Sequence, residues 1–257
     1  MNPLIIGIIA IAVLAVFFLV FNNRNQPTTT LIPMRLPTFA PITQSPTTQP
    51  PTTTKKIDNE LIVAIGINNH IWTKRKLDDY WVGPISCCVK SITQLKDGTI
   101  LGIGLDDLMY KKKNLNELWT GAIKNSCCIN HITQFNDGTI IGIGGVVLFK
   151  KNNLEDPWEG PINKSCCIQS VIQLKDGTIL GVKEDGKLWK KKNNNINEEW
   201  EGPLPNTCCV DDIAELNDGT LLGIGGNRLY KKNKLEEQWI GPIDDFHISK
   251  IIVFKNY

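Results

Sequence analysis

The sequence predicts an all-β fold built from a tandem repeat of roughly 40 residues. An Asp-Gly-Thr signature followed by an apolar run occurs four times, at Asp97, Asp137, Asp176 and Asp218. Five tryptophans keep the same spacing, which indicates five units although only four carry the signature. These repeat tryptophans, which we expect to form the core of each unit, are Trp81, Trp119, Trp158, Trp200 and Trp239.

Each unit is predicted to contain four short strands. Residues 91–95 form a β-rich run, and an Asp-Gly pair joins it to residues 99–104. Asp-Gly between two short apolar runs is a strong hairpin signal. A third run ends in basic residues, and a fourth surrounds the repeat tryptophan and its Gly-Pro. Four strands of about five residues in ~40 residues match one blade of a β-propeller.

The first and last units are complementary halves. Residues 61–66 align with residues 99–104, so the first unit begins at its second strand. Residues 248–254 align with residues 129–135, the first strand of a unit. A ring whose first and last blades share one sheet leaves no unpaired strand edge. We therefore expect a five-bladed β-propeller of four-stranded blades over residues 57–257, closed by its N- and C-terminal strands.

The order of these motifs resembles the tectonin and tachylectin-type β-propeller repeat. It runs from the tryptophan through Gly-Pro and an inner strand to Asp-Gly-Thr-Ile-Leu-Gly-Ile-Gly and Leu-Tyr-Lys, and it covers residues 57–257. The resemblance implies a propeller with a lectin-like, glycan-binding function. Two features depart from that pattern, namely the paired cysteines and the apolar residues that replace a second tryptophan, Leu101, Ile141, Leu180 and Leu222.

Residues 1–22 are predicted to be a transmembrane anchor. Residues 4–21 are eighteen consecutive apolar or glycine positions without a charge, about 27 Å as a helix. Asn2 and Pro3 suit the start of a helix. A cleaved signal peptide is the alternative, but the segment has neither a basic n-region nor a small-x-small cleavage site.

Residues 23–56 are predicted to be a disordered Pro/Thr-rich stalk. This segment contains seven prolines and ten threonines and, before Lys55, only Arg24 and Arg35 as charges, so it cannot bury a core. We expect a single-pass membrane protein of the cell surface, an endomembrane or a viral envelope. Its orientation stays open, because the two arginines favour a cytoplasmic C-terminal side whereas the N-glycosylation sequon at Asn163 favours the opposite.

Charge and composition argue against a nucleic-acid partner and against an enzyme. Two of the 28 basic residues precede Lys55, which leaves 26 against the 26 acidic ones, whereas nucleic-acid-binding domains are usually basic. His70, His131 and His247 occupy non-equivalent positions, and no nucleophile elbow or phosphate loop is present. We expect no catalytic residue, no metal and no cofactor. The basic clusters such as residues 111–113 are expected to be solvated outer hairpins.

Eight cysteines form four adjacent pairs, each just before a predicted innermost strand, where the fifth unit has Phe246-His247. Neighbouring residues on a strand point to opposite sides, so each member could bond a different neighbouring blade. Blade-to-blade disulfides, which need an oxidising environment, and buried thiols are the main alternatives, followed by vicinal disulfides and a thiolate metal site. The cysteines are Cys87, Cys88, Cys127, Cys128, Cys166, Cys167, Cys208 and Cys209.

These features predict a membrane-anchored binding module. An anchor and a spacer would hold a rigid, multivalent ring away from the membrane, and repeated sites strengthen weak binding through effective concentration. A glycan is one candidate ligand. The alternative is a structural membrane or virion-envelope protein that docks one protein partner without binding sugar. The turns after the second strands favour the alternative mildly, because they differ between units, from residues 68–70 to residues 226–228.

Overall fold

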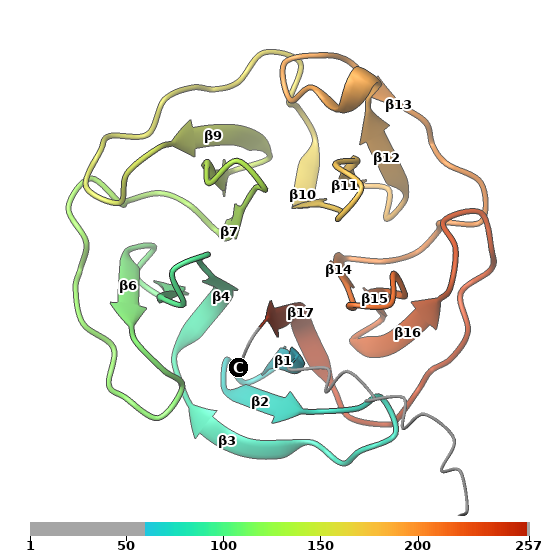
Figure 1. Cartoon of the computed structure of the whole chain (residues 1–257), viewed down its shortest axis with the longest axis horizontal. Coiled ribbons are helices and arrows are strands. Elements are labelled where there is room, and N and C mark those ends of the chain that lie inside the picture. Colours follow the sequence, from blue (N-terminus) through green and yellow to red (C-terminus); the bar gives the residue numbers. More distant parts are fainter. Residues whose placement is uncertain (1–59, 256–257) are drawn as a thin grey trace, which may run out of the picture. The chain divides into compact units, whose positions relative to one another are not determined.

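The computed structural model describes residues 60–255, and these form an all-β, propeller-like ring (Figure 1). This part contains seventeen strands and one short 3-10 turn, η1 (Lys192–Asn194). The expected anchor, residues 1–22, and the expected stalk, residues 23–56, lie outside the described residues. Within residues 60–255, no helix is long and apolar enough to cross a membrane.

The strands form five small antiparallel sheets around a central axis (Figure 1). One sheet contains, in order, β17 (Ile248–Lys255), β1 (Glu60–Gly66), β2 (Ile71–Lys74) and β3 (Val82–Ser86). The next along the chain contains β4 (Val89–Gln94), β5 (Ile100–Gly104) and β6 (Met109–Lys112). It is followed by β7 (His131–Gln134), β8 (Ile140–Gly144) and β9 (Val147–Lys151).

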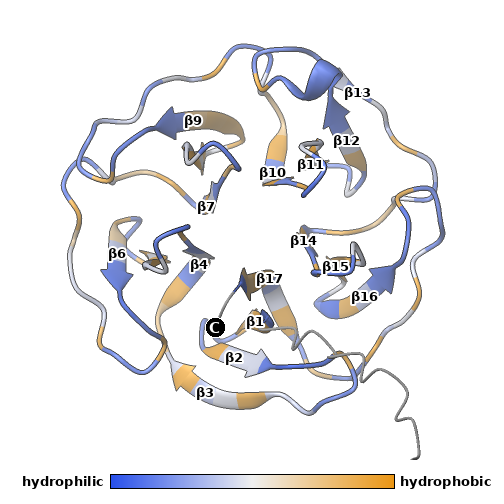
Figure 2. Ribbon diagram, in the orientation of Figure 1, coloured by the Kyte–Doolittle hydropathy of each residue, from blue (hydrophilic) through white to orange (hydrophobic). Residues whose placement is uncertain are grey.

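The remaining two sheets follow the same inner-to-outer order. One contains β10 (Ile168–Gln173), β11 (Ile179–Lys183), β12 (Leu188–Lys191) and β13 (Trp200–Glu201). The other contains β14 (Asp212–Glu215), β15 (Leu221–Gly225) and β16 (Arg228–Lys232). Figure 2 shows hydrophobic residues along the strands and mostly hydrophilic connecting loops.

The fourth strand expected in every unit is regular in only two of the five sheets. In the other three it shrinks to isolated bridges, between Lys111 and Thr120, Lys150 and Glu159, and Lys231 and Ile240. The residues on the outer side of these bridges are exposed. Because they bury little apolar surface, packing does not hold a longer outer strand in place.

The ring closes by pairing β17 with β1, as the complementary half-units predict. The register runs from Glu60 opposite Lys255 to Ile65 opposite Lys250, with an irregularity at Gly66. Strand β1 is buried at every position after Glu60, because neighbouring sheets cover both of its faces. Residues from the two ends of the described chain therefore share one sheet.

The core consists of apolar clusters that lie between neighbouring sheets. In one of them, Val63 of β1 packs with Ile92 of β4 and Ile100 of β5. A half-buried repeat tryptophan covers each cluster. The ring of Trp119 lies so close to Gly102 that a Cβ there would approach it within 2.5 Å. The repeated Gly of the Asp-Gly-Thr-Ile-Leu-Gly motif thus makes room for the tryptophan.

A set of five hydrogen bonds near the axis joins each sheet to the next. In every case a side-chain oxygen accepts from a backbone N–H at 2.7–2.9 Å. The pairs are Gln94 with Lys255, Gln134 with Lys96, Gln173 with Asn136, Glu215 with Lys175, and Glu60 with Asn217. Because β17 carries Val253 at the glutamine position, the fifth acceptor comes from β1.

Replacing Glu60 with Ala should lower the free energy of unfolding by about 1 kcal/mol, because the half-buried N–H of Asn217 loses its acceptor. Glu60→Gln should be nearly neutral, since glutamine accepts the same bond in three other sheets. Urea unfolding of the full-length chain, followed by tryptophan fluorescence, measures both variants. Equal losses in the two would show that the acceptor does not hold the closing sheet.

Candidate binding site

Each innermost strand, namely β4, β7, β10, β14 and β17, begins on one face of the ring and ends on the other. The Asp-Gly face carries the four Asp-Gly turns, in each of which the aspartate Oδ1 accepts the threonine N–H at 2.8 Å. The cysteine face carries the four cysteine pairs and the turns that follow the second strands. Backbone bonds connect these segments, for example from the Cys88 N–H to the Asn69 carbonyl at 2.8 Å.

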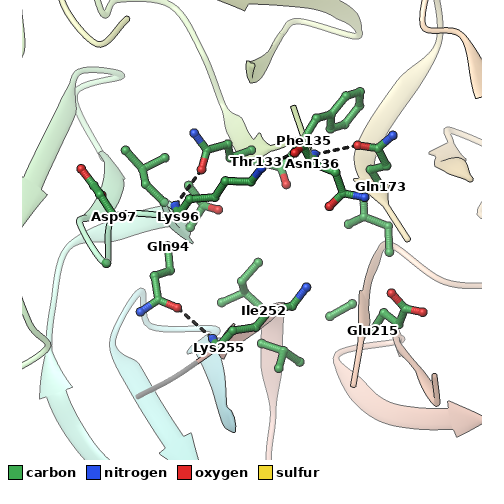
Figure 3. Close-up of a pocket in the computed structure, with 17 residues that line it drawn as sticks. Gln94, Lys96, Asp97, Thr133, Phe135, Asn136, Gln173, Glu215, Ile252 and Lys255 are labelled. Atoms are coloured by element: carbon green, nitrogen blue, oxygen red, sulfur yellow. Dashed lines mark hydrogen bonds between the residues drawn. The ribbon is translucent and has the colours of Figure 1, made fainter. Parts of the chain in front are cut away.

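A cavity of about 500 Å³ opens at the axis on the Asp-Gly face (Figure 3). All five sheets contribute to this axial cavity. Equivalent positions of the innermost strands form its inner wall, namely Thr93, Thr133, Ile172, Ala214 and Ile252. Polar residues surround its mouth, among them Lys96, Asp97, Asn136, Glu215 and Lys255. The wall is therefore hydroxylated on one side and apolar on the other.

Most side-chain amides around the axial cavity already form hydrogen bonds within the protein. Gln134 donates from Nε2 to the Gly138 carbonyl at 2.7 Å, and Gln173 donates to the Gly177 carbonyl at 3.1 Å. Lys255 and Asp97 are exposed and Glu215 is half-buried, and one oxygen of each carboxylate already accepts a backbone N–H, from Thr99 and Lys175 respectively. A ligand would therefore meet an ammonium and carboxylates at the mouth and a largely uncharged wall deeper in.

A buried polar cluster lies along the axis beside the cavity wall. The Ser170 hydroxyl donates to Asp212 Oδ1 at 2.6 Å, and the Ile251 N–H donates to Asp212 Oδ2 at 2.8 Å. Lys250 Nζ lies 3.6 Å from the same carboxylate. These contacts join β10, β14 and β17, and they balance the burial of a carboxylate that is only 1% exposed.

His131 lies in the same cluster, with its Nδ1 3.9 Å from Asp212 Oδ1. Burial, reinforced by the nearby Lys250 charge and partly offset by Asp212, lowers the pKa of His131 to about 4. The imidazole is therefore neutral at pH 7. Ser170 donates to the carboxylate and not to the imidazole, so the cluster lacks the hydroxyl–imidazole contact of an activated serine. Its adjoining space of about 10 Å³ is about the size of one water.

Each repeat tryptophan lies against the ammonium of a buried lysine. The five lysines are 0–3% exposed, and their Nζ atoms lie 4.4–4.8 Å from the ring centroids, within the range of a cation–π contact. The pairs are Lys74 with Trp81, Lys112 with Trp119, Lys151 with Trp158, Lys191 with Trp200, and Lys232 with Trp239.

Lys151, Lys191 and Lys232 also join neighbouring sheets through backbone carbonyls, and Lys74 does so through the Asp244 carboxylate at 2.8 Å. Lys191 donates to the Glu198 carbonyl of its own hairpin at 2.7 Å and to the Lys164 carbonyl of the preceding sheet at 3.0 Å. Lys232 donates in the same way to the Asn206 carbonyl at 3.0 Å. Each lysine thus receives hydrogen-bond partners that offset the cost of burying its charge.

The expectation that the basic clusters are wholly solvated was therefore wrong. In residues 111–113, Lys111 and Lys113 are exposed but Lys112 is buried. Strand alternation turns the middle side chain toward the tryptophan. Only the spacing of this lysine could have indicated its burial. It lies seven residues before the repeat tryptophan in four units, and the linker is longer between Lys191 and Trp200.

Within residues 60–255, which include all eight cysteines of the sequence, each cysteine is bonded to its sequence neighbour and none is free. Blade-to-blade disulfides are absent from this part of the chain, and six of the eight cysteines are exposed, unlike buried thiols. The pairs lie in loops before the strands, where strand alternation does not apply, and the second cysteine has positive φ. Within residues 60–255, no group of three or more His, Cys, Asp or Glu side chains could hold a metal ion.

The sequon at Asn163 has a structural explanation. Asn163 is exposed, but Ser165 is buried, donates to the Ile162 carbonyl at 2.6 Å and accepts the Leu148 N–H at 3.1 Å. Ser126 and Thr207 make the same two bonds in other sheets. The hydroxyl residue therefore belongs to the loop structure, and glycosylation of Asn163 stays a prediction.

No protein-family model matches the chain, and no curated protein matches its sequence. The tectonin and tachylectin resemblance is therefore not supported by a family match. Among solved structures, the chain is similar to a symmetrical protein described for its de novo evolutionary emergence, at 15% identity and a TM-score of 0.48, covering 67% of this chain and 86% of that one.

Two further solved structures are similar at 15% identity. One is the extracellular domain of a hybrid two-component system from B. thetaiotaomicron, with a TM-score of 0.40 and coverage of 76% of this chain and 28% of that one. The other is YCF48 bound to D1 peptide, with a TM-score of 0.38 and coverage of 70% of this chain and 63% of that one. At these TM-scores the likeness carries no argument about ligand or partner.

Lys232→Met should lower the free energy of unfolding by about 2 kcal/mol, because it leaves the Asn206 carbonyl without its donor and removes the cation over Trp239. The matched control is Lys234→Met on the exposed part of the same hairpin, which should stay within ~0.5 kcal/mol of the parent chain. Urea unfolding followed by tryptophan fluorescence measures both. If the two variants lose equal stability, the buried lysine does not stabilise the ring.

The buried lysines also predict that stability rises in mild alkali. Burial, partly offset by neighbouring carboxylates, lowers the pKa of Lys112 and of Lys191 to about 8, from 10.5 in the unfolded chain. Below pH 8 both states bind the proton and the native state bears the full cost of the buried charge. Between pH 8 and 10.5 the unfolded state binds more protons, so the free energy of unfolding increases with pH.

The full pKa shift corresponds to about 2.5 kcal/mol for each of these two lysines between pH 7 and 10. We expect about 1 kcal/mol each, because solvent around the outer hairpins screens part of the charge. Unfolding free energies measured from pH 7 to 10 should show the rise in the parent chain, and Lys112→Met/Lys191→Met should show a flatter profile. Because other groups titrate equally in both proteins, the difference between the two profiles isolates the lysines. Parallel profiles would contradict the assigned pKa shifts.

Proposed function

We propose that the chain is a five-bladed β-propeller that acts as a binding module for a protein segment, with the axial cavity as its site. The observation that carries this proposal is the asymmetry of that cavity. Its wall combines Thr93 and Thr133 on one side with Ile172, Ala214 and Ile252 on the other. One asymmetric site per ring suits a single protein partner, whereas a multivalent lectin needs several equivalent sites.

The repeat tryptophans do not provide those equivalent sites. A buried lysine Nζ lies 4.4–4.8 Å from the centroid of each tryptophan side chain. In four sheets a glycine of the second strand also packs against the indole. A sugar would have to displace this packing in order to stack there. The geometry therefore favours the protein-docking alternative over the glycan-binding one.

The cavity suits an uncharged side chain that is flanked by charged groups. The deeper wall offers methyl and hydroxyl groups, while Lys255, Asp97 and Glu215 surround the mouth (Figure 3). A protein segment can place an apolar or small polar residue inside and pair its neighbours with these charges. The proposal includes no catalysis, no cofactor and no nucleic-acid partner.

The proposal also includes a membrane location. The anchor, residues 1–22, and the stalk, residues 23–56, rest on the composition of the sequence. In this arrangement the stalk holds the ring away from the bilayer, so that the axial cavity can reach a partner on the same or an opposing surface. The side of the membrane on which the ring lies is left open.

Selection of a random peptide library on the full-length chain in detergent, with a broad glycan array in parallel, tests the proposal. We expect enriched peptides that share a sequence pattern and bind once per chain. Lys255→Glu reverses a charge at the mouth and should weaken them by about tenfold, or ~1.4 kcal/mol. Lys234→Glu makes the same charge change on the outer hairpin and should leave binding unchanged.

Two outcomes would overturn the proposal. Saturable glycan binding with several equivalents per chain would establish a multivalent lectin. Peptide binding that Lys255→Glu and Lys234→Glu weaken equally would place the site away from the axis.

A further inference from the structure

The cysteine face carries four disulfides, each between two residues adjacent in sequence. They occur at the same place in four of the five sheets, in the loop that leads to the innermost strand. At least one cysteine of every pair is exposed. The four sulfur pairs are therefore on one face of the ring and open to solvent, on the side opposite the axial cavity.

Stapling of the fold does not account for these disulfides. A disulfide stabilises a protein mainly by restricting its unfolded chain, and the effect grows with the length of the loop that it closes. Between adjacent residues that loop is as short as it can be. None of the four bonds joins two sheets, so none holds the ring together.

The fifth loop shows that the fold can form this segment without cysteines. There Phe246 packs against Trp72 at a centroid distance of 4.8 Å and against Trp81 at 5.6 Å. The following Ile248 still donates its N–H to Asn227 at 3.0 Å, as Val210 does to Gly186 at the same distance. An aromatic side chain thus replaces the disulfide, and the connection to the neighbouring turn is kept.

The backbone conformation at the second cysteine of each pair also argues against a purely structural reason for cysteine at this position. Its φ is +74° at Cys88, +76° at Cys128, +72° at Cys167 and +144° at Cys209. Residues with a Cβ are disfavoured there, and glycine adopts such angles without strain. Loop shape alone would favour glycine, yet cysteine occupies the position four times. What cysteine adds is its sulfur chemistry.

We propose that the cysteine face is a thiol–disulfide exchange site whose substrates are dithiols, including paired cysteines of other proteins. A substrate thiolate attacks one Sγ of a pair, the intramolecular S–S bond breaks, and a mixed disulfide forms while the other Sγ leaves as a thiolate and takes up a proton. The second substrate thiolate then attacks the mixed disulfide. It forms the substrate disulfide and releases the second cysteine as a thiolate, which is also protonated.

Each exchange moves two electrons and two protons from the dithiol to one cysteine pair. The oxidised chain can therefore oxidise four dithiols, one for each disulfide, and it then carries eight thiols. This activity needs neither the axial cavity nor its partner, because the two sites lie on opposite faces. A negative result in the peptide selection leaves it standing, and its own failure leaves the binding proposal standing.

Titration of the oxidised full-length chain in detergent with dithiothreitol, under native conditions, tests the exchange. We expect four equivalents of oxidised dithiothreitol and eight alkylatable cysteines per chain by mass spectrometry, with the tryptophan fluorescence of the folded ring retained. Cys127→Ser/Cys128→Gly, in which glycine suits the positive φ, should lower the yields to three equivalents and six cysteines. A peptide with two reduced cysteines should react with the same stoichiometry.

Three outcomes would overturn the exchange site. Reaction only after denaturation would show that the disulfides are not accessible to thiols. Loss of the folded fluorescence in step with reduction would show that they staple the ring. Eight free thiols in the chain isolated without reductant would show that the pairs do not form disulfides at all.

Discussion

The ring depends on a lysine side chain that is buried beside a repeat tryptophan in each of the five sheets. Each ammonium lies against a tryptophan ring and donates to at least one backbone carbonyl. Lys191, for example, lies between Trp200 and the carbonyls of Glu198 and Lys164. A single side chain thus contacts the aromatic cover of the core and, in four sheets each, its own hairpin and the preceding connection. Apolar packing holds the inner strands, and these lysines hold the outer parts, where Figure 2 shows mostly hydrophilic loops.

Near the axis, neighbouring sheets are joined by side-chain hydrogen-bond acceptors and not by buried lysines. The innermost strands face the axis with one backbone edge, and side-chain oxygens such as those of Gln94 and Glu215 accept N–H groups of the neighbouring sheet. Deeper along the axis, Asp212 does this for Ile251. The equivalent positions differ from sheet to sheet, so a repeated backbone carries an unrepeated set of side chains. This is why a nearly symmetrical fold presents one asymmetric cavity.

The repeat features were predictable from sequence because they obey local rules. The Asp-Gly turns, the spacing of Trp119 and Trp158, and the pairing of the two end strands follow from turn chemistry and periodicity. The axial cavity was not predictable, since its lining residues, such as Thr93 and Ile252, are far apart in sequence and individually unremarkable. Lys112 was misjudged because charge alone suggests solvent, and only the tertiary contacts reveal its partners. The sequence predicted disulfides as one possibility at the cysteine pairs but left the pairing open, because positive φ at Cys128, which takes the pair out of strand geometry, cannot be read from the sequence.

The pairing of β1 with β17 has a consequence for how the protein is made. These two strands are the first and last of the described chain, so a ribosome produces almost the whole ring before the partner of β1 exists. Until then β1, with six buried residues in the finished sheet, has an open apolar edge that can pair with other nascent chains. High contact order at this one seam slows closure relative to the hairpins within each sheet. A chain that terminates before β17 therefore leaves the edge of β1 unpaired, and this edge is where a chaperone would bind the nascent chain.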